Sequence, residues 1–306
     1  MTSDANFEQV FCHRLLQIPT VSHSITILFS LLVEEMNLKG LDHGIDINSP
    51  YFVAWFIGVP AVFIGLVLLF RGLDLWNFKT RRGSRASDIM AFEIVAGLCV
   101  LYLAVAGVIG SFGLFGFPNE YARLRDLDKF YARSTFVEDH LVYPMISYQG
   151  WNLLISFFNN DLNDPAMIMH HLITGSLGYF GLYPYLHFNG LFYFGIAELT
   201  NVPLTIVDIF KYFPDLAKRF SWLNELCRYS FAISFFILRI IVWPYVSYEF
   251  WVGSVNLLQS GKAHSTFVVA FFLLANLFLT GLQFFWCSKI FGFLFKKPKG
   301  SAEKSK

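Results

Sequence analysis

Long apolar stretches alternate with short polar ones along most of the chain. Seven of these stretches are long enough for a helix that crosses a bilayer, which takes about 20 residues at about 1.5 Å each. They lie at 51–70, 89–115, 140–158, 166–186, 189–208, 225–251 and 264–286. The pattern predicts an all-α polytopic membrane protein with about seven transmembrane helices. The short connection around "HFNG" predicts that the fourth and fifth helices are adjacent and antiparallel.

The composition supports a membrane protein. Hydrophobic residues make up 55% of the 306 residues and charged residues only 15%, against roughly 25% in soluble domains. The 36 Phe residues offer more apolar surface than one globular core can cover, so lipid must solvate the rest. The net charge of +1 argues against nucleic acid as a partner. Four widely separated cysteines predict neither a disulfide framework nor a zinc site, and no bound metal or cofactor is expected.

The pattern divides the chain into four regions. Residues 1–50 show no features of a cleaved signal peptide, and the apolar patch at 25–33 is too short to span, which predicts an interfacial or buried helix. Residues 51–88 hold the first transmembrane helix and a basic loop, and residues 89–295 hold the other six helices. Residues 296–306 form a basic, disordered tail. Within the large region, mixed charges at 116–139 predict a surface helix at the membrane interface.

The polar connections predict how the helices are oriented. With seven spans, the segments 71–88, 159–165 and 209–224 fall on the same side as the tail from Lys289. That side carries twice as many Lys and Arg residues as the other, and an excess of positive charge marks the cytosolic side. We therefore expect a cytosolic C-terminus and an N-terminus that is outside or lumenal.

Polar residues inside the spans are the candidates for function, because ionisable groups in a bilayer are costly unless they are paired or hydrated. His170 and His171 stand near the start of the fourth span, and Thr174 follows one turn later. Glu198 lies on the returning fifth span, about two turns deeper, where a pairing with a histidine is compatible with the spacing. Two interpretations are open. The rings and the carboxylate are hydrogen-bonded packing groups, or one imidazole is a general base or nucleophile for acyl transfer.

Arg239 lies in the middle of the sixth span, where an isolated guanidinium would be expensive. We expect it to pair with a carboxylate such as Glu93 or Glu198, or with a bound phosphate group. Pro203 and Pro244 predict kinks, which often occur in helices that line cavities. A cavity is therefore predicted, and the polar residues expected to line it are Thr174, Asn201, Thr205, Asp208 and Arg239.

The histidine pair and the segment "AELTNVPLTIVDIFKYF" in the next span resemble the TLC-domain family. This family includes the ceramide synthases and a set of smaller TLC-domain-containing proteins. The resemblance covers roughly 89–295 and implies a six-helix barrel around a lipid-accessible cavity, usually in the endoplasmic reticulum. In ceramide synthases the histidine pair, here His170 and His171, is implicated in moving an acyl group from acyl-CoA to a sphingoid amine.

The span after the histidine pair departs from the ceramide synthase pattern. Ceramide synthases have two aspartates three residues apart there, whereas this chain has Glu198 and Asn201. The segment "ELTNVP" is closer to the smaller TLC-domain proteins, whose assigned roles concern phospholipid composition and membrane fluidity. The resemblance therefore implies, first, a protein of membrane lipid homeostasis whose partners are membrane lipids. The alternative is an acyl-CoA-dependent N-acyltransferase with His170, His171 and Glu198 as catalytic residues, acyl-CoA as co-substrate and a sphingoid or other amine as acceptor.

Overall fold

The computed structural model describes residues 45–46, 48–113, 128–183 and 185–294. Within these ranges the regular structure is helical, apart from one isolated bridge between Lys79 and Arg85. The patch at 25–33 and the tail 296–306 lie outside the described residues. So does most of the predicted interfacial helix, whose described part starts with a short 3-10 turn at Asp128–Tyr131.

Within the described ranges, five helical stretches are long and apolar enough to cross a membrane. They are α3 (Pro50–Gly72), α4 (Ala86–Ser111), and the stretches His187–Tyr212, Ser221–Gln259 and Thr266–Gly292. The stretch His187–Tyr212 contains α9 (His187–Gly190) and α10 (Asn201–Tyr212), and Ser221–Gln259 contains α12 (Ser221–Phe235) and α13 (Trp243–Gln259). The last stretch belongs to α14 (Thr266–Leu294). The protein is a polytopic, all-α membrane protein.

Two of the seven predicted spans are occupied by shorter α-helices. The segment predicted at 140–158 contains α7 (Tyr143–Phe158), which continues from α6 (Thr135–Val137) through a π-helical segment at Glu138–Val142. The segment predicted at 166–186 contains α8 (Pro165–Gly181). The helix ends at Gly181 because the chain then turns, and Leu186 adopts a left-handed φ of 60°. The prediction that "HFNG" connects two adjacent helices was wrong, because His187–Gly190 is the first turn of the next helix, and α8 packs mainly on α7 and α14 instead of on that helix.

Three prolines follow stretches where the helix is not α-helical. Pro144 and Pro244 come just after the π-helical segments Glu138–Val142 and Phe236–Val242. Pro203 follows the 3-10 segment Ile196–Thr200. Proline has no N–H and its ring collides with the carbonyl four residues earlier, so the preceding turn must change its hydrogen bonds. The changed turns free backbone carbonyls inside the protein.

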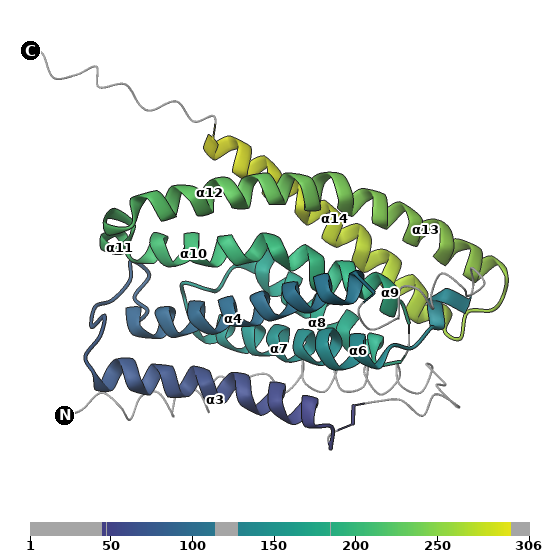
Figure 1. Ribbon diagram of the computed structural model, residues 1–306, viewed down its shortest axis with the longest axis horizontal. Helices are drawn as coiled ribbons and strands as arrows, with labels where there is room; N and C mark the ends of the chain where they lie inside the picture. Colours follow the sequence, from purple (N-terminus) through teal and green to yellow (C-terminus); the bar gives the residue numbers. More distant parts are fainter. Residues whose placement is uncertain (1–44, 47, 114–127, 184, 295–306) are drawn as a thin grey trace, which may run out of the picture.

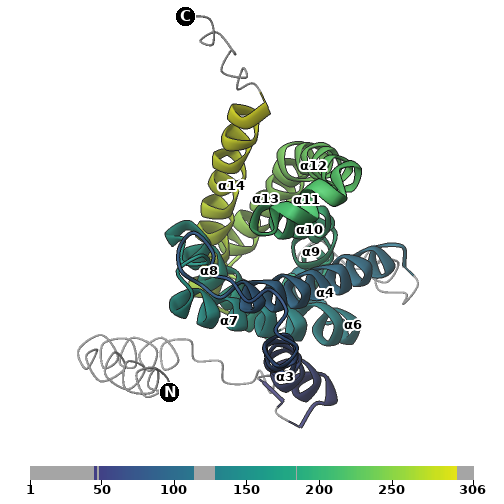
Figure 2. The same cartoon turned by 90° about the vertical axis from the view of Figure 1, so that its left-hand side faces the viewer.

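Six helical segments contact one another in a ring, which Figure 2 shows end on. Around the ring, α4 packs on α7, α7 on α8, α8 on α14, and α14 on α13. Helices α13 and α12 belong to the same continuous stretch, Ser221–Gln259, and α12 packs on α10, which in turn packs on α4. Helix α3 lies outside the ring and packs along α4 and α7 (Figure 2). Aromatic side chains pack in the interface between α3 and the ring of helices, Trp55 against Tyr102 and Phe63 against Trp151. A hydrogen bond of 2.8 Å from Ser147 Oγ to the Trp55 carbonyl adds to it.

The helices run roughly side by side along the long axis of the molecule (Figure 1). We call one end of the bundle the α11 end, because α11 (Pro214–Arg219) lies there with the connections 73–85 and 159–164. The Thr80 hydroxyl donates to Asp161 across this end, at 2.5 Å. The other end, the α9 end, contains α9 and the connections 128–134 and 260–265. The backbone N–H of His264 donates to the Tyr131 hydroxyl there, at 3.2 Å.

Candidate functional site

A cavity lies inside the bundle, between α8, residues 185–198, α13 and α14. It has about 740 Å³ of space between its lining atoms, part of it open to the surroundings. Its walls are mainly apolar and aromatic, including Leu177, Phe194, Trp243, Phe250 and Phe272. Neither the connections of the α11 end nor helices α3 and α4 contribute to the lining. An apolar and aromatic lining with a few polar groups is typical of pockets that bind small organic molecules.

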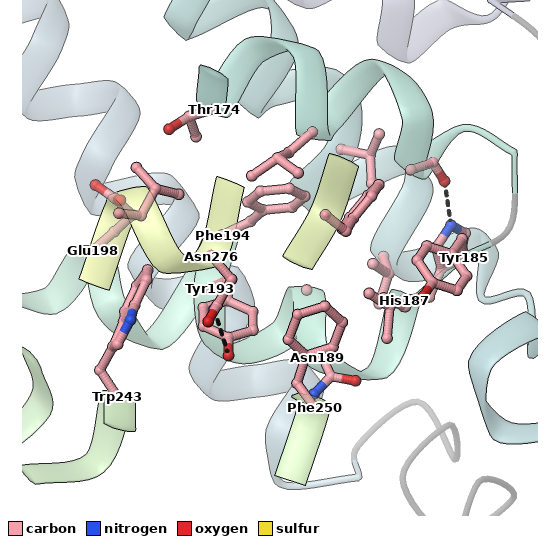
Figure 3. A pocket seen from close by; sticks show the side chains of 18 of the residues that line it. Thr174, Tyr185, His187, Asn189, Tyr193, Phe194, Glu198, Trp243, Phe250 and Asn276 are labelled. Atoms are coloured by element: carbon pink, nitrogen blue, oxygen red, sulfur yellow. Dashed lines mark hydrogen bonds between the residues drawn. The ribbon is translucent and has the colours of Figure 1, made fainter. Parts of the chain in front are cut away.

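Charged residues meet at one end of the cavity. Thr174, Glu198 and Trp243 lie at this end, while Tyr185 and His187 lie at the other (Figure 3). The Arg239 guanidinium is buried and stands 3.7 Å from a Glu198 carboxylate oxygen. Glu198 is therefore the partner of Arg239, one of the two carboxylates expected from the sequence. The pair carries no net charge, and among the described residues it includes the only acidic and basic side chains, other than histidines, that line the cavity.

The broken helix before Pro203 explains how Arg239 is held. Its Nη2 donates to the Ala197 carbonyl at 2.8 Å, and its Nε donates to the Thr200 hydroxyl at 3.3 Å. Ala197 and Thr200 both belong to the 3-10 segment Ile196–Thr200, where carbonyls are not all used by α-helical bonds. The guanidinium therefore has several acceptors in addition to the carboxylate, as a buried cation requires.

The two adjacent histidines face different surroundings. His170 lines the cavity, and its ring stands 5.6 Å from the ring of Trp286 on α14. His171 is buried toward α7, where its Nδ1 makes a hydrogen bond of 2.5 Å with Gln149 Oε1. Side chains of adjacent helical residues diverge by about 100°, so one ring reaches the cavity and the other the neighbouring helix. The roles of both histidines remain predictions.

The three predicted cavity residues of α10 do not line the cavity. Asn201 Nδ2 donates to Glu198 Oε2 at 2.7 Å, so Asn201 supports the carboxylate from outside. The Thr205 hydroxyl donates to the Asn201 carbonyl, at 3.0 Å, and its methyl group faces Gly97 on α4. Asp208 pairs with Lys211 nearer the α11 end, at 3.4 Å. Thr174 and Arg239, in contrast, do line the cavity.

Sequence reasoning missed a polar cluster in the middle of the cavity wall. The Tyr193 hydroxyl lies 3.0 Å from Ser247 Oγ, and Asn276 Nδ2 donates to both oxygens at 3.2 and 3.1 Å (Figure 3 shows Tyr193 and Asn276). Trp251 Nε1 completes the cluster with a bond of 3.0 Å to Asn276 Oδ1. Asparagine within an apolar span was the signal that could have found it. The cluster ties α13 and α14 to the π-helical segment Leu191–Gly195.

His187 fixes the other end of the cavity. The backbone N–H of Ser134 donates to its Nδ1 at 3.0 Å, and its Nε2 lies 2.6 Å from the Gly181 carbonyl. The ring is therefore neutral, with its proton on Nε2. No group of three or more metal-ligating side chains occurs in the part of the chain that the structure describes.

The fold and the cavity define a polytopic membrane protein with an internal, largely apolar site. Residues 96–292, well over half of the chain, match the family model of the TLC domain, which is named for the TRAM, LAG1 and CLN8 proteins. The chain belongs to the TLC-domain family, so the resemblance seen in the sequence is confirmed. No curated protein and no solved structure matches the chain.

Proposed function

We propose that the protein binds a membrane lipid in this cavity and acts in membrane lipid homeostasis, without acyl transfer. The observation that carries the proposal is the cavity itself. Its walls are apolar and aromatic, and its only carboxylate and guanidinium neutralise each other. Such walls fit acyl chains. The family resemblance further favours the endoplasmic reticulum as the compartment, and the charge pattern favours a cytosolic C-terminus.

We also propose that all seven predicted spans cross the membrane and that six of them form the TLC-type barrel. Helix α8 has 17 residues, or about 25 Å of length. Helix α7 has 16 residues and is extended by the helical residues from Thr135 onward. Together they lie in the ring between α4 and α14, which are long enough to span. Their position therefore supports a barrel of six crossing helices with α3 outside.

Acyl transfer is the second candidate, because His170 faces the cavity. An acyltransferase of this kind needs cations near the cavity mouth for the phosphates of acyl-CoA and a group that orients the imidazole. Arg82 instead donates to the Asn160 carbonyl, at 3.3 Å, and Lys211 pairs with Asp208. Glu198 forms an ion pair with Arg239 and accepts a hydrogen bond from Asn201. These contacts favour lipid binding over catalysis.

A direct assay separates the two candidates. Purified protein is incubated with an acyl-CoA and a panel of amines that includes a long-chain base. We expect no amide product whose formation depends on the histidines, when the wild type is compared with His170→Ala and His171→Ala. Acyl transfer by the wild type that His170→Ala abolishes would make the protein an N-acyltransferase.

A matched pair of substitutions on α14 tests lipid binding. Leu279 lines the cavity, whereas Leu277, on the same helix, is 59% exposed on the outer surface. We expect Leu279→Trp to fill the cavity and reduce the lipid that copurifies with the protein by at least about tenfold, as measured by mass spectrometry of extracts. Leu277→Trp adds the same ring on the outside and should leave the amount unchanged. Equal lipid in both variants would place the bound lipid elsewhere.

A further inference from the structure

Buried polar atoms without a hydrogen-bond partner lie near both ends of the cavity, and those near the charged end come from three side chains. The Thr174 hydroxyl is buried, faces the cavity and has no partner among the described residues. The same holds for Nδ1 of His170, which also lines the cavity. Gln283 on α14 is fully buried, and neither its amide oxygen nor its amide nitrogen has a partner within the described ranges. A buried polar group that makes no hydrogen bond costs about 1–3 kcal/mol.

The spacing on α14 places Gln283 close to His170. Asn276 and Leu279 line the cavity, and Gln283 follows one turn after Leu279 on the same face of the helix. Trp286 follows three residues later, so its Cβ lies about 5–6 Å from that of Gln283. The ring of Trp286 is the one that contacts His170. Gln283 is not itself among the lining residues, and this spacing places it one turn beyond Leu279, on the side of α14 toward Trp286 and His170.

The charges at this end restrict what can bind there. Arg239 is already committed to Glu198, Ala197 and Thr200. No other lysine or arginine lines the cavity. An anionic head group would thus meet no unpaired basic side chain from Lys or Arg, and it would lose its hydration without compensation. An uncharged group with both donors and acceptors would instead satisfy a hydroxyl, an imidazole nitrogen and an amide.

We propose that Thr174, His170 and Gln283 form a subsite for the uncharged, hydroxyl-bearing head group of a lipid whose chain lies along the aromatic wall. The inference rests on the proposed lipid-binding function and specifies the ligand class. Head-group hydroxyls donate to His170 Nδ1 and to the Gln283 oxygen, and they accept from the Thr174 hydroxyl and the Gln283 amide nitrogen. This subsite makes Gln283 a binding residue.

The test compares lipids that share one acyl chain and differ in head group. Binding of monooleoylglycerol, oleate and oleoyl-CoA to the detergent-purified full chain is measured by competition against radiolabelled monooleoylglycerol. We expect monooleoylglycerol to bind at least about tenfold more tightly than either anion. If oleate or oleoyl-CoA binds as tightly, the subsite is not selective for an uncharged group and the inference fails. If the wild type binds none of the three, the proposed function itself fails.

Two variants test the residues, with Ser176→Ala as the control. Ser176 lies on α8 two residues beyond Thr174, and its hydroxyl donates to the Leu172 carbonyl, at 2.8 Å. We expect Thr174→Val and Gln283→Leu each to weaken monooleoylglycerol binding by about threefold to tenfold, because each removes hydrogen bonds to the ligand. Ser176→Ala should bind as the wild type does. Unchanged binding in both cavity variants would overturn the inference.

The melting temperature of the lipid-free protein provides a second readout. Replacing an unpartnered buried polar group by an apolar group of similar shape is neutral or stabilising. We therefore expect Tm of lipid-free Gln283→Leu and Thr174→Val to equal or exceed that of the wild type. A fall in Tm of several degrees in both variants would show that these side chains serve the fold, and it would contradict the subsite.

Discussion

Replacing Arg239 with methionine is expected to destabilise the protein by about 3–5 kcal/mol, because it leaves the Glu198 carboxylate buried without a cation. The same change removes the bonds that Arg239 donates to Ala197 and Thr200. Methionine has a similar length but no donor, so the loss comes from electrostatics and hydrogen bonding more than from packing. The free energy of unfolding is measured by SDS-driven unfolding in mixed micelles.

The double variant with Glu198→Gln separates the charge from the other contacts. Once the carboxylate is neutral, losing the guanidinium should cost less, so the double variant should be more stable than the sum of the single changes predicts. Arg219→Met on exposed α11 is the control and should change the stability by less than about 0.5 kcal/mol. A loss of less than about 1 kcal/mol in Arg239→Met would show that the pair contributes little to the fold.

Substituting alanine for Gly107 is expected to cost at least about 3 kcal/mol, because no space exists for a Cβ where α4 crosses the His187–Tyr212 stretch. A Cβ at Gly107 would lie 2.4 Å from the Cα of Gly195 and 2.6 Å from the backbone N of Ile196. These atoms are backbone, so relief requires that two helical segments move apart. Thermal unfolding and the yield of monodisperse protein measure the effect.

Gly65→Ala is the matched control for this crossing. Gly65 lies inside α3, and a Cβ there has no atom within 4 Å. Because alanine favours the helix over glycine, we expect a change between zero and a gain of about 1 kcal/mol. If Gly107→Ala behaved like Gly65→Ala, the close approach of Gly107 and Gly195 would not exist in the folded protein.

Much of the fold could be predicted from the lengths of the apolar stretches. The long apolar runs 51–70 and 264–286 became helices, the first with nearly the same bounds and the second continuing to Leu294, because few other structures satisfy the backbone in lipid. The boundaries around 181–190 could not be predicted in this way. The chain turns there through Leu186. The polar sequence "HFNG" is helical because tertiary contacts stabilise it, such as the hydrogen bond that the Ser134 backbone N–H donates to His187.

The site was partly predictable because ionisable residues in apolar spans are rare and are usually functional or paired. His170, Glu198 and Arg239 were found by that rule, and all three line the cavity. The rotation of each helix was not predictable. A π-helical segment and a 3-10 segment precede Asn201, and because both differ from about 3.6 residues per turn, the faces of α10 could not be read from α-helical spacing. Thr205 contacts α4 at Gly97, and Asp208 pairs with Lys211.

The position of α3 has a consequence for how a molecule could travel between the bilayer and the interior. The aromatic side chains of α3 cover the interface between α4 and α7, and neither α3 nor α4 lines the cavity. On this side of the bundle, α3 and α4 separate the cavity from the surroundings. The described residues that line the cavity come instead from α8, α13 with the π-helical segment before it, α14, residues 185–198 and the start of the α6–α7 segment. A lipid that entered the cavity from the bilayer would therefore have to pass between these elements and not past α3.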